Sequence, residues 1–204
     1  AYVLFLLLRQ IGQPEEDEEP VQEEILEETQ EPLLNDEPKD TTGEEGEPVV
    51  SYEDMTVSSQ MTLTEDLEVG NLVVNRELHL NGHRLLVHGD VTLNNTLYME
   101  EGYLQVEGSF TVKYNGVTSM NSLNDYIEVA GDYVYNSSYY YNRVISSGTM
   151  VIGGNIYGDN GTDYCNTSFI FDTECKVIMN GNRVQNVDIR TDSKFQIRNL
   201  IIEN

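Results

Sequence analysis

Five aspartates are the candidate catalytic acids and bases of this sequence. They are Asp90, Asp132, Asp159, Asp163 and Asp172. Paired carboxylates in the groove of a parallel β-helix would indicate polysaccharide cleavage. No spacing among the five fixes an acid and a base at a working separation, and the sequence has no serine-hydrolase, zinc-protease or phosphate-loop motif. We therefore expect a non-catalytic protein, with a polysaccharide lyase or hydrolase as the alternative.

Three histidines, His79, His83 and His88, lie within ten residues and raise the possibility of a metal site. Zinc is held by three or four ligands in a tetrahedral arrangement. The directions of the three side chains cannot be fixed from the sequence, because Asn81-Gly82 interrupts the strand pattern between them. With no fourth ligand in the pattern, we expect solvent-facing histidines and no cofactor.

Cys165 and Cys175 are the two cysteines of the chain. In an exported protein a pair at this spacing is a candidate disulfide, which would stabilise the fold by about 3 kcal/mol. In a cytosolic protein they would be two ordinary thiols. The sequence has no C-x-x-C motif, so a zinc or thioredoxin-like site has little support.

A run of three tyrosines, Tyr139, Tyr140 and Tyr141, is the candidate binding site of the sequence. Three adjacent side chains cannot all face a core, so at least one is expected to be exposed. Exposed aromatic residues on loops are typical of contacts with glycans and proteins. We predict that this loop binds a glycan or a cell-surface protein; the alternative is a loop that packs its own aromatic side chains.

Four stretches of nine residues carry a central glycine, with apolar residues at positions one, three and seven. They are LLVHGDVTL (85–93, Gly89), LQVEGSFTV (104–112, Gly108), IEVAGDYVY (127–135, Gly131) and MVIGGNIYG (150–158, Gly154). This alternation indicates strands with one buried face. A two-residue hairpin at the glycine would put positions three and seven on opposite faces. We therefore interpret each glycine as an inward-pointing position where a strand bends, the corner of a solenoid.

A short polar residue follows each of these glycines: Asp90, Ser109, Asp132 and Asn155. In a solenoid the four would stack as a ladder. Such a column could hold calcium, which takes several oxygen ligands, or it could bond to the backbone of the turns. Only two of the four are charged and no nonapeptide calcium-binding repeat is present, so we expect a structural ladder.

The glycine-centred unit returns every 19 to 23 residues, which is typical of a repeat architecture. Turn residues separate short alternating runs, with room for three strands in each repeat. The predicted fold is an all-β, single-stranded parallel β-solenoid of about five or six coils over residues 61–204, roughly 25 Å long.

The preceding residues belong to a different compositional class. Half of the 36 acidic residues and all five prolines lie before residue 61. Residues 10–60 are therefore predicted to be a disordered acidic linker, and the apolar residues 1–9 a remnant of an export or anchor segment. The formal charge of −25 is the reverse of a nucleic-acid-binding footprint. We expect no nucleic-acid partner, and a membrane contact only through the N-terminal anchor.

The run from Gly102 to Asn204 resembles a β-solenoid module of large exported and cell-surface proteins of Gram-positive, especially clostridial, bacteria. The similarity rests on GYLQVEGSFTV, DYIEVAGDYVY, SSGTMVIGGNIYG and CKVIMNGNRVQNVDIRTDSKFQIRNLIIEN. The family commonly has His in place of Cys175, and Asp-Phe in place of Asn155 and Ile156. The module's activity is unassigned, and it has no catalytic residues to carry over. The resemblance implies an extracellular structural or adhesive module that presents or spaces adjacent domains of a longer chain.

Overall fold

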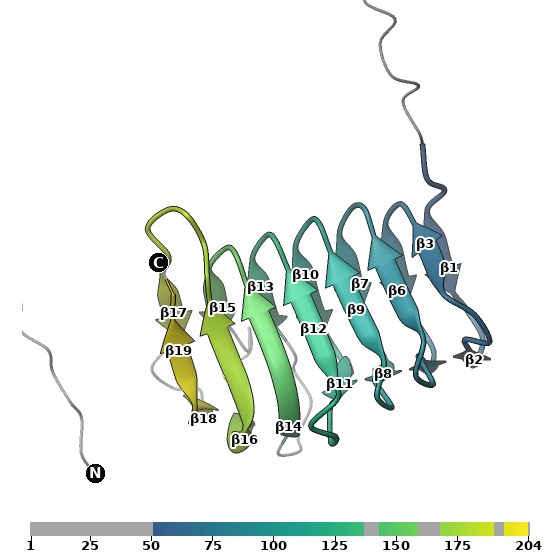
Figure 1. Ribbon diagram of the computed structural model, residues 1–204. Helices are drawn as coiled ribbons and strands as arrows, with labels where there is room; N and C mark the ends of the chain where they lie inside the picture. Colours follow the sequence, from purple (N-terminus) through teal and green to yellow (C-terminus); the bar gives the residue numbers. More distant parts are fainter. Residues whose placement is uncertain (1–50, 137–142, 159–167, 190–193, 204) are drawn as a thin grey trace, which may run out of the picture. The chain divides into compact units, whose positions relative to one another are not determined.

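The structure is a computed structural model that describes residues 51–136, 143–158, 168–189 and 194–203. Residues 46–204 form one compact unit. The described residues form strands and turns without a helix, and the strands stack in parallel into a β-solenoid (Figure 1). The predicted fold class is confirmed, with about five full turns.

Three parallel sheets make up the walls of the solenoid. Sheet A contains β1 (Met55–Val57), β4 (Leu72–Val74), β7 (Val91–Leu93), β10 (Phe110–Lys113), β13 (Tyr133–Asn136), β15 (Ile156–Gly158) and β17 (Val187–Ile189). Sheet B contains β2 (Met61–Thr62), β5 (Leu78–His79), β8 (Thr96–Tyr98) and β11 (Val117–Ser119). Sheet C contains β3 (Leu67–Val69), β6 (Arg84–Val87), β9 (Tyr103–Val106), β12 (Tyr126–Val129), β14 (Arg143–Ile152), β16 (Ser168–Met179) and β18 (Lys194–Ile197), and β19 (Leu200–Ile202) also pairs with β16.

The solenoid begins earlier than the boundary predicted at residue 61. Strand β1 starts at Met55, and its residues Met55 and Val57 pair in register with Leu72 and Val74 of β4. Acidic neighbours made this segment look like linker in composition, whereas its alternation is that of a strand. The predicted boundary is therefore wrong by six residues.

The core consists of apolar columns in which each inward residue rests on its counterpart in the preceding coil. One column in sheet C is formed by Val69, Val87, Val106, Val129, Ile152 and Met179. In sheet A, the ring of Tyr133 stacks on Phe110 at 5.7 Å and meets Phe171 edge-on. Tyr133 is fully buried and Tyr135 nearly so, as the alternation predicted.

The four predicted corner glycines lie between strands of sheets C and A, and the reason for glycine there is close approach of neighbouring coils. The backbone N–H groups of Gly89, Gly108, Gly131 and Gly154 each donate to the carbonyl of the glycine one coil earlier, and this series starts at the carbonyl of Gly70. A Cβ on Gly108 or Gly131 would lie 2.6 Å from that carbonyl oxygen. The missing side chain would thus meet the preceding coil, and close approach of the two backbones requires glycine.

The turns from sheet B to sheet C use left-handed backbone in the early coils. Asn81 and Gly82 have φ of 51° and 80°, and Glu100 and Glu101 have φ of 49° and 66°. In the next coil a side chain closes the turn instead. The buried carboxylate of Asp125 accepts the backbone N–H groups of Glu101, Asn121 and Ser122 at 2.7 to 2.9 Å.

Later coils differ, because two long strands replace the short strands of sheets B and C. β14 and β16 pair along most of their length, with a register shift between Ile145 and Ser147. Gly148 follows the shift with φ of 101°.

Candidate functional site

Several of the predicted functional residues lie outside the described part of the chain. These are Tyr139, Tyr140, Tyr141, Asp159, Asp163 and Cys165. The tyrosine-loop hypothesis therefore stays a prediction, whereas the candidate disulfide between Cys165 and Cys175 is contradicted because Cys175 is a free cysteine. Cys175 lies in β16 as a free thiol that is buried in the core, and this burial raises its pKa to about 12.

The predicted polar ladder is present and is longer than the sequence indicated. Its members are Asp54, Asn71, Asp90, Ser109, Asp132, Asn155 and Asn186. In each step the side-chain oxygen of one member accepts the backbone N–H of the member one coil later, at 2.7 to 3.2 Å. Each member directly precedes the first residue of a sheet A strand. The short polar residue before each predicted strand is therefore the sequence signal for the additional members.

The ladder places Asp90 and Asp132 in structural roles. Their Oδ1 atoms accept the backbone N–H groups of Ser109 and Asn155, both at 2.7 Å. These bonds satisfy backbone groups at the corner. Within the described segments, no group of three or more His, Cys, Asp and Glu side chains could hold a metal ion.

Asp172, the remaining candidate acid that the structure describes, forms an ion pair with Arg198. Its Oδ1 accepts a hydrogen bond from Nη1 of Arg198 at 2.8 Å and another from the backbone N–H of Thr173 at 2.7 Å. The bond from Thr173, followed by that from Arg198, lowers the pKa of this carboxyl. This pair connects β16 to the segment between β18 and β19.

The three histidines are not brought together, because each faces carboxylates of neighbouring coils. Nδ1 of His79 lies 3.0 Å from Glu100, and Nδ1 of His83 lies 3.5 Å from Asp66. The imidazole of His88 has two carboxylate neighbours. They are Glu107, at 3.1 Å from Nδ1, and Glu68, at 3.4 Å from Nε2. The sequence predicts solvent-facing histidines. In the structure the three side chains are partly buried between coils.

A hollow lies on the outside of the corner between sheets C and A. The residue before the corner glycine is His88 in one coil and Glu107 in the next, then Ala130, then Gly153. His88 and Glu107 fill this position with large side chains that contact each other at 3.1 Å, whereas Ala130 and Gly153, which line the hollow, have a methyl group and no side chain. The space arises from this loss of side-chain volume in two successive coils.

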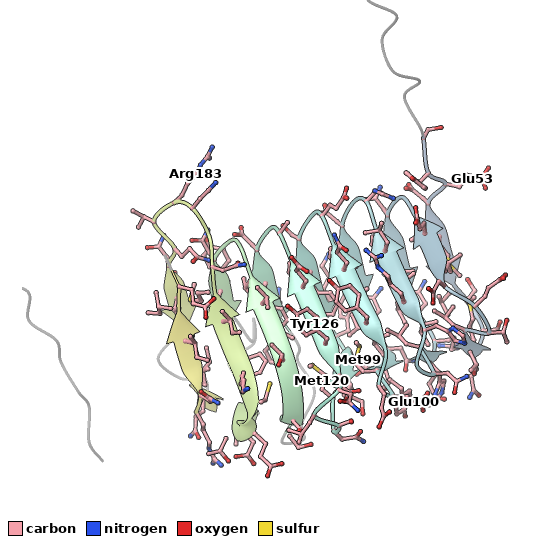
Figure 2. All side chains as sticks on the ribbon, viewed as in Figure 1. Glu53, Met99, Glu100, Met120, Tyr126 and Arg183 are labelled. Atoms are coloured by element: carbon pink, nitrogen blue, oxygen red, sulfur yellow. The ribbon has the colours of Figure 1, made fainter. Side chains whose placement is uncertain are left out.

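A longer loop forms one wall of this hollow. The backbone N–H of Asn180 donates to the carbonyl of Ile152, as that of Gly153 does to the carbonyl of Val129 one coil earlier, so Asn180 is equivalent to Gly153. Asn186 is the ladder residue that follows Asn155. Five residues, 181–185, therefore occupy the position that Gly154 fills alone. We call residues 181–185 the corner loop. Figure 2 shows Arg183 extending outward from it.

Gln185 fixes the base of the corner loop. Its side-chain Nε2 donates to the carbonyls of Ile152 and Gly154, and its Oε1 accepts the backbone N–H of Gly181 at 2.9 Å. The amide thus bonds to the Gly154 carbonyl, which a corner glycine would otherwise bond. Because this base is fixed, the middle of the loop projects, and Val184 is 89% exposed.

The hollow has two lobes that share Ala130, Gly153 and Asn182. The first lobe has a volume of about 290 Å³ and is lined by Glu128, Val129, Ala130, Gly153, Asn180, Gly181 and Asn182. The second lobe has a volume of about 280 Å³ and is lined by Ala130, Gly153, Gly154, Asn155, Asn182, Arg183, Val184 and Gln185. Amides, one carboxylate and one guanidinium thus surround a space that the sequence analysis did not predict.

A pair of tyrosines lies on the outer face of sheet C, on the strands that lead to the first lobe. The rings of Tyr103 and Tyr126 stack at 5.1 Å, and the Tyr103 hydroxyl donates to Glu128 at 2.7 Å. Burial, together with this hydrogen bond, raises the pKa of Tyr103 to about 12. Glu128 is therefore held in place at the wall of the lobe.

Comparisons with family models, curated proteins and solved structures found no match to this chain. In the part of the chain that the structure describes, no helix has the length and apolar character needed to cross a bilayer.

Proposed function

We propose that this protein is a non-catalytic structural or adhesive module that spaces or presents adjacent domains. The observation that carries the proposal is the coil-to-coil bonding of its polar groups. The ladder, the His88 contacts with Glu68 and Glu107, and the Asp125 turn all join neighbouring coils. These groups hold the coils together in a self-supporting stack.

The stack provides a spacer of defined length. Strands of one sheet lie about 4.8 Å apart, so the seven strands of sheet A extend over about 30 Å. A rigid spacer keeps its two ends at a constant separation, whereas a flexible chain samples a broad distribution.

Fluorophores attached at Glu53 and Glu203, near the two ends of the described solenoid, test this role by energy transfer. We expect the transfer efficiency to stay constant in urea until the solenoid unfolds cooperatively. A gradual change at low urea would contradict the spacer. Incubation with polysaccharides, followed by analysis for new reducing ends or unsaturated products, tests the enzymatic alternative, because any product release overturns a non-catalytic role.

We also propose that the protein is exported and acts outside the cell. The resemblance of residues 102–204 to an exported bacterial module and the apolar residues 1–9 support this location. Protease treatment of intact Gram-positive cells that produce the chain provides the test. Digestion in intact cells is expected, and protection until lysis would contradict the proposal.

A further inference from the structure

We propose that the hollow beside the corner loop binds an acidic glycan, with a sugar carboxylate at Arg183 and a neutral sugar unit beside Glu128. This inference deepens the adhesive part of the proposed function and rests on it. It identifies a ligand class and a binding site separate from the tyrosine run at residues 139–141.

The size of the hollow suits two adjacent sugar units. Pockets for drug-sized ligands have volumes of roughly 300 to 1,000 Å³, so lobes of about 290 and 280 Å³ each suit a smaller group such as one sugar ring. Because the lobes share Ala130, Gly153 and Asn182, two linked units can occupy them together.

The second lobe has the charge that an anionic group requires. Its lining includes the guanidinium residue Arg183 and the amides of Asn155, Asn182 and Gln185, with no carboxylate residue. This composition stands out in a chain with a formal charge of −25. A guanidinium binds a carboxylate through two parallel hydrogen bonds, which favours a sugar acid over a neutral sugar.

The groups needed for binding are available. The amides of Asn155 and Gln185 already bond to protein groups. In contrast, the side chains of Asn182 and Arg183 make no hydrogen bond or ion pair with other described residues. These two side chains can therefore bond to a ligand without breaking a hydrogen bond or ion pair to any residue that the structure describes.

The first lobe suits a neutral, hydroxyl-rich unit. Glu128 accepts hydrogen bonds, and Asn180 and Asn182 can both donate and accept them. The Tyr103 hydroxyl fixes the position of Glu128, so little side-chain entropy is lost on binding. Tyr126, two residues before Glu128 on the outer face of β12, extends the surface with an aromatic ring.

Isothermal titration of the full chain tests the site. The probe is a hexasaccharide that alternates glucuronic acid with N-acetylglucosamine, compared with an N-acetylglucosamine hexamer and a hexaglutamate peptide. We expect binding of the acidic hexasaccharide and much weaker binding of the other two. Arg183→Gln should weaken binding by about tenfold or more, the usual effect of losing a charged hydrogen bond.

Matched variants separate the site from general charge effects. Arg76→Gln removes the same charge from the early coils and should leave binding unchanged. Ala130→Glu should abolish binding without lowering the melting temperature, because the equivalent position one coil earlier is Glu107. Ala130→Ser leaves the hollow open and should retain binding.

The proposal would be overturned by no binding of the acidic hexasaccharide, by equal losses in Arg183→Gln and Arg76→Gln, or by full binding of Ala130→Glu. Equal binding of hexaglutamate would show a site for anions rather than for glycans and would also overturn it. Chromatography of the titrated samples separates this failure from that of the proposed function. Cleaved hexasaccharide would contradict the non-catalytic role and leave the site intact, whereas absent binding would leave the spacer role intact.

Discussion

The early and late coils of this solenoid differ in regularity. From β1 to β12, three short strands make each turn, and successive ladder residues from Asp54 to Ser109 lie 17 to 19 residues apart. From Asp132 to Asn186 the spacing grows to 23 and then 31 residues, and sheet B has no further strand in the described part of the chain. The early coils use their polar groups for stacking, and the late coils add the corner loop and the hollow. A repeat can therefore form a hollow where its regularity is broken.

The largest effect is expected from Gly89→Val in the regular half. A side chain there would meet Asn71 and the Gly70 carbonyl, so the coils must move apart. We expect a loss of about 3 kcal/mol or more in the free energy of unfolding, measured by urea denaturation.

Gly82→Ala is the matched control for this corner. Gly82 has φ of 80° with no atom within 4 Å of its missing Cβ, so only the left-handed backbone is penalised, by about 1 kcal/mol. Equal losses in the two variants would show that close approach between coils is not the reason for the corner glycine.

Substitutions in the ladder should lower the free energy of unfolding by a smaller amount. One ladder residue from each half of the solenoid allows a direct comparison. Asp90→Ala and Asp132→Ala each remove the acceptor for one backbone N–H, which should cost about 1 kcal/mol. Asp132 also accepts the side chain of Asn155 at 3.0 Å, so its replacement should cost more. Denaturant midpoints of the two variants measure the difference, and a larger loss for Asp90→Ala would contradict this ranking.

The reactivity of the Cys175 thiol reports on packing in the late coils, and its measurement needs no change in stability. The core covers its thiol, and burial raises its pKa to about 12, so little thiolate is available at neutral pH. In a Cys165→Ser variant, a thiol reagent should react only as fast as the protein unfolds. Rapid labelling of folded protein would show that the late coils open locally.

The smallest effect is expected at the ion pair between Asp172 and Arg198. The pKa of Asp172 is lowered in the folded state, so its contribution to stability is present above the unfolded-state pKa of about 3.9. This contribution is lost as the pH falls through the lower folded-state pKa. Below about pH 5 the melting temperature should therefore fall with pH, and Asp172→Asn should reduce this pH dependence. Identical pH dependence in both proteins would exclude Asp172 as its source.

Much of the fold could be predicted because the residues that specify it are local. Val87 and Val91 flank Gly89 with a parity that a bent strand satisfies and a two-residue hairpin does not. Gly70 does not fit the nine-residue pattern with a central glycine. Its corner is one residue shorter, because Val69 directly precedes the glycine. The early start at Met55 was missed for a different reason. The acidic composition of residues 10–60 predicted a linker, and the alternating run at Met55 is short.

The candidate site could not be predicted because it depends on volumes in different coils. Ala130 and Gly153 create a hollow only in relation to His88 and Glu107, which requires the register between coils. The role of Gln185 likewise depends on carbonyls more than 30 residues earlier in the chain. The alternation that identifies strands contains no information about these distances.

Hydrogen–deuterium exchange of the full chain, with and without the acidic hexasaccharide, tests most directly whether the late coils carry function on a regular scaffold. We predict added protection at residues 128–130, 153–155 and 180–186, with no change at residues 67–106. Protection confined to residues 67–106, or none at the corner loop when the hexasaccharide is bound, would contradict this account.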